Sequence, residues 1–72
     1  MRTKNVYENM RVEMARRDVS IQDVAETLGV DRSTAGAKLS GKRQFWLQEA
    51  LDLSQKLFDG LSVEYLFSIK KG

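Results

Sequence analysis

A cluster of basic residues is the feature of this sequence with the clearest chemistry. Four cationic side chains fall between positions 32 and 48 with no acidic residue among them: Arg32, Lys38, Lys42 and Arg43. The acidic residues lie before and after this stretch. Locally concentrated positive charge attracts phosphate groups, so the cluster predicts contact with a nucleic acid. A solvated surface without a ligand is the alternative, because the net charge of the chain is only +2.

The residue types that most catalytic and metal-binding chemistry requires are absent. The chain has no histidine and no cysteine, which removes the commonest general base, the thiol nucleophile and the commonest zinc ligands. No glycine-rich phosphate loop occurs, and the carboxylates are interleaved with basic residues. We therefore expect no enzyme activity, no catalytic residue, no cofactor and no metal site.

The length of 72 residues predicts one small domain, stabilised by helix packing and assisted by self-association. The apolar runs are short and interrupted by charge, far below the roughly 20 apolar residues of a membrane span. The N-terminus carries no apolar signal segment. These features predict a cytoplasmic protein without a membrane partner.

Apolar residues at helical spacing predict four or five helices and no strand, which is an all-α fold. The first helix is expected from Asn5, as its cap, to Arg17, and Asp31 is a good cap for the third. The later helices are expected over residues 20–28, 31–39, 47–58 and from about residue 63. The predicted core residues include Met10, Met14, Leu47, Leu51 and Leu57.

Residues 21–40 have the pattern of two short helices joined by a tight turn. Ser20 and Asp23 have the spacing of a capping box at the start of the first helix. Gly29 can end that helix, because glycine adopts a positive φ angle without steric cost. Ala25 leaves room for the two helices to cross closely. Together these features are typical of a helix-turn-helix motif.

Several stretches resemble the phage-repressor/Cro-like helix-turn-helix family. Residues 21–30 (IQDVAETLGV) are similar to its second helix and turn, and residues 38–42 (KLSGK) to the segment after its recognition helix. The similarity continues through Phe45 and residues 47–51 to residues 61–65, in the same order. The resemblance implies a lambda-repressor-like domain that binds double-stranded DNA as a homodimer. It also implies a bacterial or phage transcriptional regulator of the repressor type.

The resemblance further implies roles for individual residues. The helix at 32–39 would enter the major groove and read bases through four outward-facing residues: Arg32, Ser33, Gly36 and Ala37. Arg32 suits a guanine, the Ser33 hydroxyl both donates and accepts, and Ala37 suits a thymine methyl group. Contacts to the DNA backbone would come from Ile21, Gln22, Lys38, Ser40, Lys42 and Arg43. Because only one long side chain is available for base contacts, we expect low sequence selectivity or reliance on DNA shape.

Four apolar residues have two interpretations. Trp46 either covers the core beside Phe45 or is exposed and marks a partner surface. Tyr65, Phe67 and Ile69 either complete the core or form a dimer patch. A second function also stays open, in which the same fold is a protein-interaction module without DNA readout. An antitoxin or a phage immunity component would be of this kind.

Overall fold

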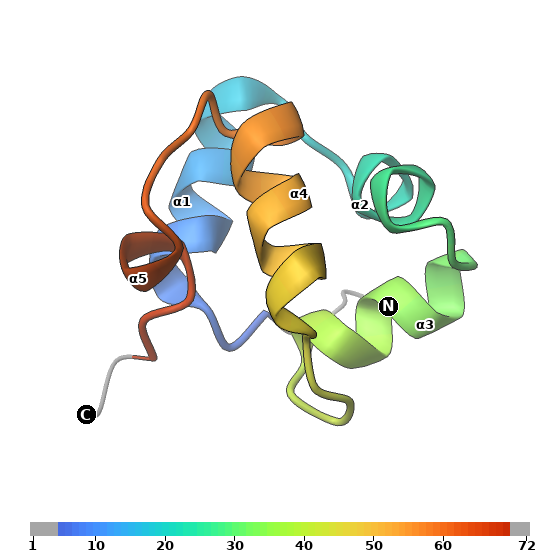
Figure 1. The fold of residues 1–72 in the computed structure, drawn as a ribbon. Coiled ribbons are helices and arrows are strands. Elements are labelled where there is room, and N and C mark those ends of the chain that lie inside the picture. Colours follow the sequence, from blue (N-terminus) through green and yellow to red (C-terminus); the bar gives the residue numbers. More distant parts are fainter. Residues whose placement is uncertain (1–4, 70–72) are drawn as a thin grey trace.

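The computed structural model describes residues 5–69, which form five helices and no strand. The helices are α1 (Glu8–Arg17), α2 (Ile21–Leu28), α3 (Arg32–Leu39), α4 (Leu47–Leu57) and α5 (Val63–Leu66). Figure 1 shows α4 in the middle of the molecule, with α5 on one side and the α2–α3 pair on the other. The prediction of an all-α fold is confirmed. None of the helices within residues 5–69 is long and apolar enough to cross a membrane.

The helix ends around α2 and α3 are formed as the sequence predicts. The Ser20 hydroxyl accepts a hydrogen bond from the Asp23 N–H at 3.1 Å, and the Asp23 carboxylate accepts one from the Ser20 N–H at 2.9 Å. Asp31 caps α3 by accepting a 2.7 Å hydrogen bond from the Thr34 N–H. These bonds satisfy donors that have no partner within a helix, so both helices begin at defined residues.

The start of α1 differs from the prediction. Asn5 does not cap the helix; its side-chain oxygen accepts a 2.8 Å hydrogen bond from the N–H of Tyr7, and α1 begins at Glu8. The chain before α1 is held by a tertiary contact, because the Val6 N–H donates to the Leu39 carbonyl at the end of α3 at 3.0 Å. This contact keeps the chain outside the helix, and Asn5 stabilises a local turn instead.

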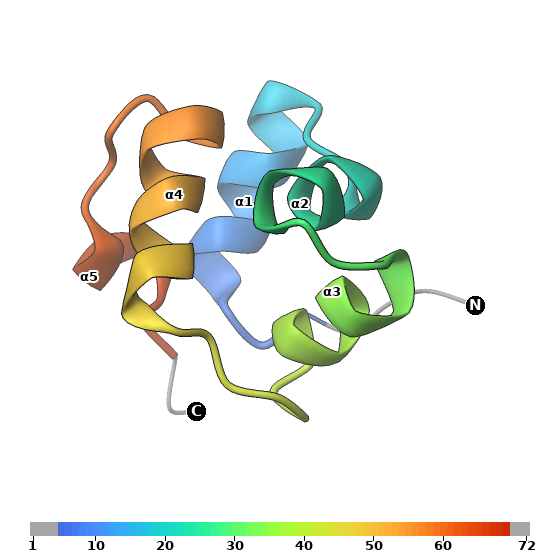
Figure 2. The same cartoon turned by 45° about the vertical axis from the view of Figure 1, so that its right-hand side comes forward.

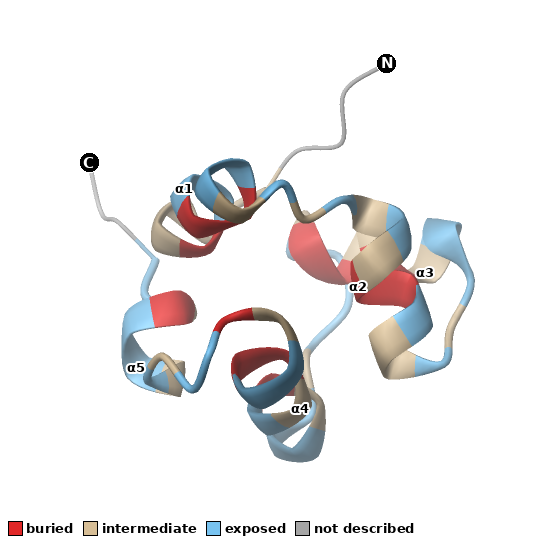
Figure 3. Cartoon of the chain, turned by 90° about the horizontal axis from the view of Figure 1, so that it is seen from above, coloured by how far each residue is buried: buried red, intermediate tan, exposed pale blue. Residues whose placement is uncertain are grey.

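The core lies between the helices and is filled from all five of them. Figure 3 shows the buried segments facing the middle of the molecule. The buried cluster consists of Met10, Met14, Val24, Ala25, Ala35, Leu39, Leu53, Phe58 and Leu66. Both methionines are therefore core residues, as predicted, and their flexible side chains suit an irregular space between helices.

The face that α4 turns toward the core is only partly the predicted one. Ala50, Leu53 and Ser54 are buried, and Leu57 packs against the core. Leu47 is 71% exposed and Leu51 is 37% exposed, so the assignment of these two leucines to the core was wrong. A helix of eleven residues buries one side only, and here that side contains positions i, i+3, i+4 and i+7 starting from Ala50.

Candidate nucleic-acid interface

The turn between α2 and α3 brings the two helices into close contact. Gly29 ends α2 in the left-handed conformation with φ of 71°, and the Val30 N–H donates to the Ala25 carbonyl at 3.0 Å. Ala25 and Ala35 are both fully buried. A larger side chain at either alanine would have to displace its neighbours, because protein cores are closely packed. Two small residues and one glycine thus set the geometry of this helix pair.

The outer side of α3 faces solvent. Figure 2 shows α3 at the margin of the molecule, where its backbone lies close to that of α2. Arg32 and Ser33 in its first turn are exposed, and Gly36 and Ala37 are half-buried. All four residues predicted to read bases therefore reach the surface, most fully at the start of the helix. Beyond Ser33 the predicted base-reading surface carries only the methyl group of Ala37, because Gly36 has no side chain.

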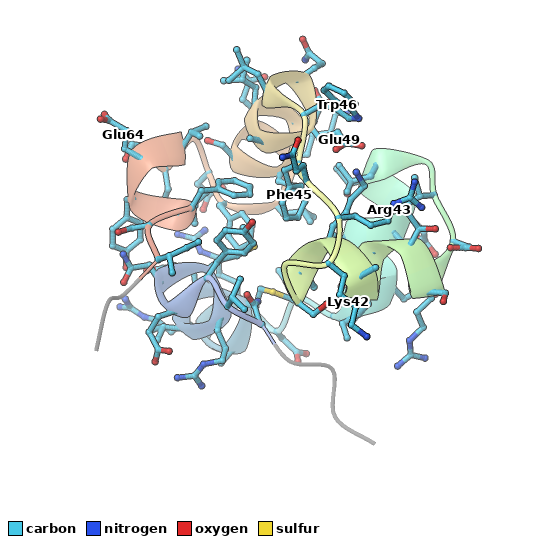
Figure 4. All side chains as sticks on the ribbon, turned by 90° about the horizontal axis from the view of Figure 1, so that it is seen from below. Lys42, Arg43, Phe45, Trp46, Glu49 and Glu64 are labelled. Carbon is cyan, nitrogen blue, oxygen red and sulfur yellow. The ribbon has the colours of Figure 1, made fainter. Side chains whose placement is uncertain are left out.

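Two of the predicted phosphate-binding cations lie on the loop that follows α3. Lys42 and Arg43 are exposed, and Figure 4 shows both side chains extending from this loop. Their backbone N–H groups donate to the Ala37 carbonyl at 2.9 and 3.2 Å, respectively, and the Ser40 hydroxyl donates to the same oxygen at 3.1 Å. Gly41 allows the turn with φ of 86°. The first half of the loop is consequently tied to the last turn of α3.

Asp31 is an acidic residue that interacts with one of these cations, Arg43. Hydrogen bonding from Thr34, by its side chain and then its N–H, lowers the pKa of Asp31, and the charge of Arg43 lowers it further. The carboxylate is thus ionised at neutral pH and serves as the cap of α3. Its charge is partly offset by Arg43, which reduces its repulsion of a phosphate.

The predicted contacts at the start of α2 involve the backbone more than side chains. Ile21 is half-buried, and Gln22 is exposed with its amide donating to Glu26 at 3.2 Å. The N–H groups of these first two helical residues have no partner inside the helix. They are available to an anion, although the Asp23 carboxylate lies in the same turn.

Lys38 does not lie where a phosphate could reach it. The residue is 5% exposed, and its Nζ donates to the Gln44 carbonyl at 2.9 Å and to the Glu49 carboxylate at 3.0 Å. The ring of Phe45 lies 5.8 Å from Nζ. The burial of this ammonium group argues against the predicted DNA-backbone contact at Lys38. The residue stands on the buried side of α3, beside Leu39, and its long side chain reaches a carboxylate from α4.

Glu49 is the partner of Lys38, and the sequence analysis did not identify it. Its carboxylate also accepts a 3.0 Å hydrogen bond from the Trp46 N–H, which starts α4. A signal was present, because a glutamate three residues after the N-cap is the second half of a capping box. Its approach to Lys38, eleven residues earlier, has no local signature.

The aromatic residues beside the loop divide into a packed group and an exposed group. Tyr7, Phe45 and Phe67 contact one another edge to face, with ring centroids 4.9 to 5.7 Å apart. Trp46 is 69% exposed, so it belongs to the surface and not to the core. Tyr65 and Ile69 are also exposed, at 39% and 56%. Phe67 thus completes the core, whereas the other three are available to a partner.

Trp46 and Leu47 border an open apolar depression of about 500 Å³. Phe67 and Ile69, near the C-terminus, also line this depression. The depression adjoins the loop that carries Lys42 and Arg43, because Gln44 and Phe45 of the same loop also line it. Figure 4 labels Phe45 and Trp46 next to these two cations. No protein-family model matches the chain, and the searches found no significant match among curated proteins or solved structures.

Proposed function

We propose that the chain binds double-stranded DNA through α3 and acts as a transcriptional regulator of the phage-repressor/Cro type, on a lambda-repressor-like fold. The observation that carries the proposal is the exposed start of α3, with Arg32 foremost, beside two exposed cations on the adjoining turn, Lys42 and Arg43. A protruding helix flanked by positive charge suits a major groove between two phosphate backbones.

In this proposal the first turn of α3 reads the bases. The exposed guanidinium of Arg32 suits a bidentate contact to guanine, and Ser33 suits a base or a phosphate. Gly36 and Ala37 present little side chain, so the helix can approach the base edges closely, with the Ala37 methyl against a thymine. One long base-reading residue favours modest selectivity supported by DNA shape.

The remaining contacts orient the protein on the DNA backbone without reading sequence. Lys42 and Arg43 bind phosphates from the loop after α3, with Ser40 at the start of that loop. The N–H groups of Ile21 and Gln22 bind a further phosphate at the start of α2. Lys38 is not among these contacts, because its ammonium group is buried.

Titration of duplex DNA at several salt concentrations tests the proposal. Binding should weaken as salt rises, with a log–log slope of about −0.9 for each phosphate neutralised. The double variant Lys42→Ala/Arg43→Ala should lose about 0.9 of slope for each of its two cations. Arg16→Ala/Lys56→Ala is the matched control, since it removes two exposed cations from α1 and α4 and should leave the slope unchanged. Absence of binding to any duplex at low salt would refute the proposal.

The exposed apolar residues support a homodimer and also the alternative function. Trp46 and Leu47 are both more than two-thirds exposed, and exposed tryptophan is enriched at partner surfaces. In a DNA-binding dimer the two α3 helices would lie roughly 34–36 Å apart, one turn of DNA. Sedimentation of the wild type and of Trp46→Ser/Leu47→Ser, with Val12→Ser as the exposed apolar control, tests self-association.

A tight complex with another protein that survives Arg32→Ala and Lys42→Ala would favour the interaction module instead.

A further inference from the structure

The loop at residues 40–46 is held at two places by α3. Its first half is tied to the last turn of α3, because the N–H groups of Lys42 and Arg43 donate to the Ala37 carbonyl. Its second half is held by a side chain, since the Nζ of Lys38 donates to the Gln44 carbonyl at 2.9 Å. The two exposed cations therefore carry the first attachment themselves, and the second attachment follows directly after them, at Gln44.

The second attachment belongs to a small, largely buried network. The Glu49 carboxylate accepts hydrogen bonds from the Lys38 Nζ and from the Trp46 N–H, each 3.0 Å long. The side chain of Lys38 is 7% exposed and that of Glu49 is 18% exposed. The network joins α3, the loop and the start of α4.

A buried ion pair is a poor device for stability alone. Removing two charges from water costs about as much as their attraction returns, and apolar replacements of similar volume are often as stable. A lysine here does something that an apolar residue cannot, because it donates to a backbone carbonyl six residues further along the chain. Its specific effect is on the conformation of the loop.

We propose that Lys38 is a positioning residue, which fixes the loop at residues 40–46 so that Lys42 and Arg43 are preorganised for phosphate. The inference rests on the proposed DNA binding for its purpose, but the fixing of the loop is independent of DNA. An ordered loop binds more tightly than a mobile one, because the loss of conformational entropy is already complete before binding.

The double variant Lys38→Met/Glu49→Gln tests the inference. Methionine fills a similar volume without donating, and the amide oxygen of glutamine can still accept from the Trp46 N–H. The thermal midpoint should stay close to that of the wild type, while affinity for a duplex falls about 10-fold, from the cost of ordering the freed loop. The salt slope should not change, because Lys38 itself touches no phosphate.

The salt slope separates positioning from direct contact. A slope reduced by about 0.9 in Lys38→Met/Glu49→Gln would mean that Lys38 binds a phosphate, and would overturn the inference. Unchanged affinity would overturn it as well. If the double variant does not fold, Lys38→Met alone serves the same purpose, because Glu49 is partly exposed and keeps its bond from the Trp46 N–H.

Trp46 supplies a readout that needs no DNA. It is the single tryptophan of the chain and stands at the end of the loop. Lys38→Met/Glu49→Gln should lower the fluorescence anisotropy of Trp46, because the chain at Gln44, two residues before it, is no longer held. Lys42→Ala/Arg43→Ala should not lower it. Unchanged anisotropy in the Lys38 variant overturns the inference. If the Lys38 variant shows lowered anisotropy but the wild type binds no duplex, the role of Lys38 in fixing the loop is upheld. Only the proposed DNA-binding function is then refuted.

Discussion

The hydroxyl of Tyr65 donates a 3.0 Å hydrogen bond to the carboxylate of Glu13, which is 5% exposed, and so joins α5 to α1. The same carboxylate accepts from Arg17 at 3.3 Å and from Arg16 at 3.4 Å. Arg17 also pairs at 2.6 Å with Asp59, which lies in the segment between α4 and α5. A short C-terminal helix of four residues is thereby fastened to the body of the molecule.

Tyr65→Phe should destabilise the protein at neutral pH and flatten its response to acid. The hydrogen bond from Tyr65 is the largest cause that holds the pKa of Glu13 below its ordinary value, with Arg17 and Arg16 adding to it. A carboxyl whose pKa is lowered by folding stabilises the protein above its unfolded pKa, and this contribution is lost as the pH falls through the folded pKa.

Urea unfolding between pH 7 and pH 3 measures this effect. The wild type should lose more stability than Tyr65→Phe as the pH falls below about 4.5, so the two curves should converge in acid. Tyr7→Phe is the control, because the structure gives the Tyr7 hydroxyl no hydrogen bond within residues 5–69. Parallel curves for the wild type and Tyr65→Phe would contradict the prediction.

Gly29→Ala should lower the free energy of unfolding by about 1 kcal/mol through the backbone alone. A Cβ atom at Gly29 meets nothing within 4 Å, so no clash contributes, but φ of 71° is unfavourable for alanine. Gly29→Asn should cost less, because asparagine tolerates the left-handed conformation better. Chemical denaturation of both variants checks this. Equal losses for alanine and asparagine would point to a cause other than backbone conformation.

Leu53→Ala and Leu47→Ala should differ sharply in stability although both leucines are on α4. Leu53 is fully buried, and its truncation should cost about 2–5 kcal/mol. Leu47 is 71% exposed, so its truncation should cost about 0.5 kcal/mol or less in the monomer. Thermal unfolding at low protein concentration compares them. Similar losses would show that Leu47 is buried in solution, by the core or by a second copy.

Arg32→Ala should relax the base preference of the proposed DNA complex at one position. Loss of a bidentate guanine contact should cost about 1–3 kcal/mol on the preferred duplex and little on a non-specific one. Arg32→Lys should recover phosphate attraction without the bidentate geometry. Selection from random duplexes, followed by titration of the best sequence, measures both effects. A uniform loss on all duplexes would assign Arg32 to the backbone instead.

The sequence by itself determined the features that depend on residues close together in the chain. The capping box of Ser20 and Asp23, the Asp31 cap and the turn at Gly29 each need only three or four neighbouring residues, and all were predicted. The outward-facing position of Arg32 and Ser33 was expected from the family resemblance, and both residues are exposed. Local hydrogen bonds and φ preferences act in the same way in any fold, so they are visible in sequence.

Only the tertiary structure decided which side of each helix is covered, and therefore which charges and apolar groups are free. The burial of Lys38 depends on Glu49, and the start of α1 depends on a bond to Leu39 more than thirty residues away. The exposure of Leu47 depends on which side of α4 the rest of the chain covers. Helical periodicity identifies residues that share a face of a helix. Which face is buried depends on the residues that pack against it, and these come from distant parts of the chain.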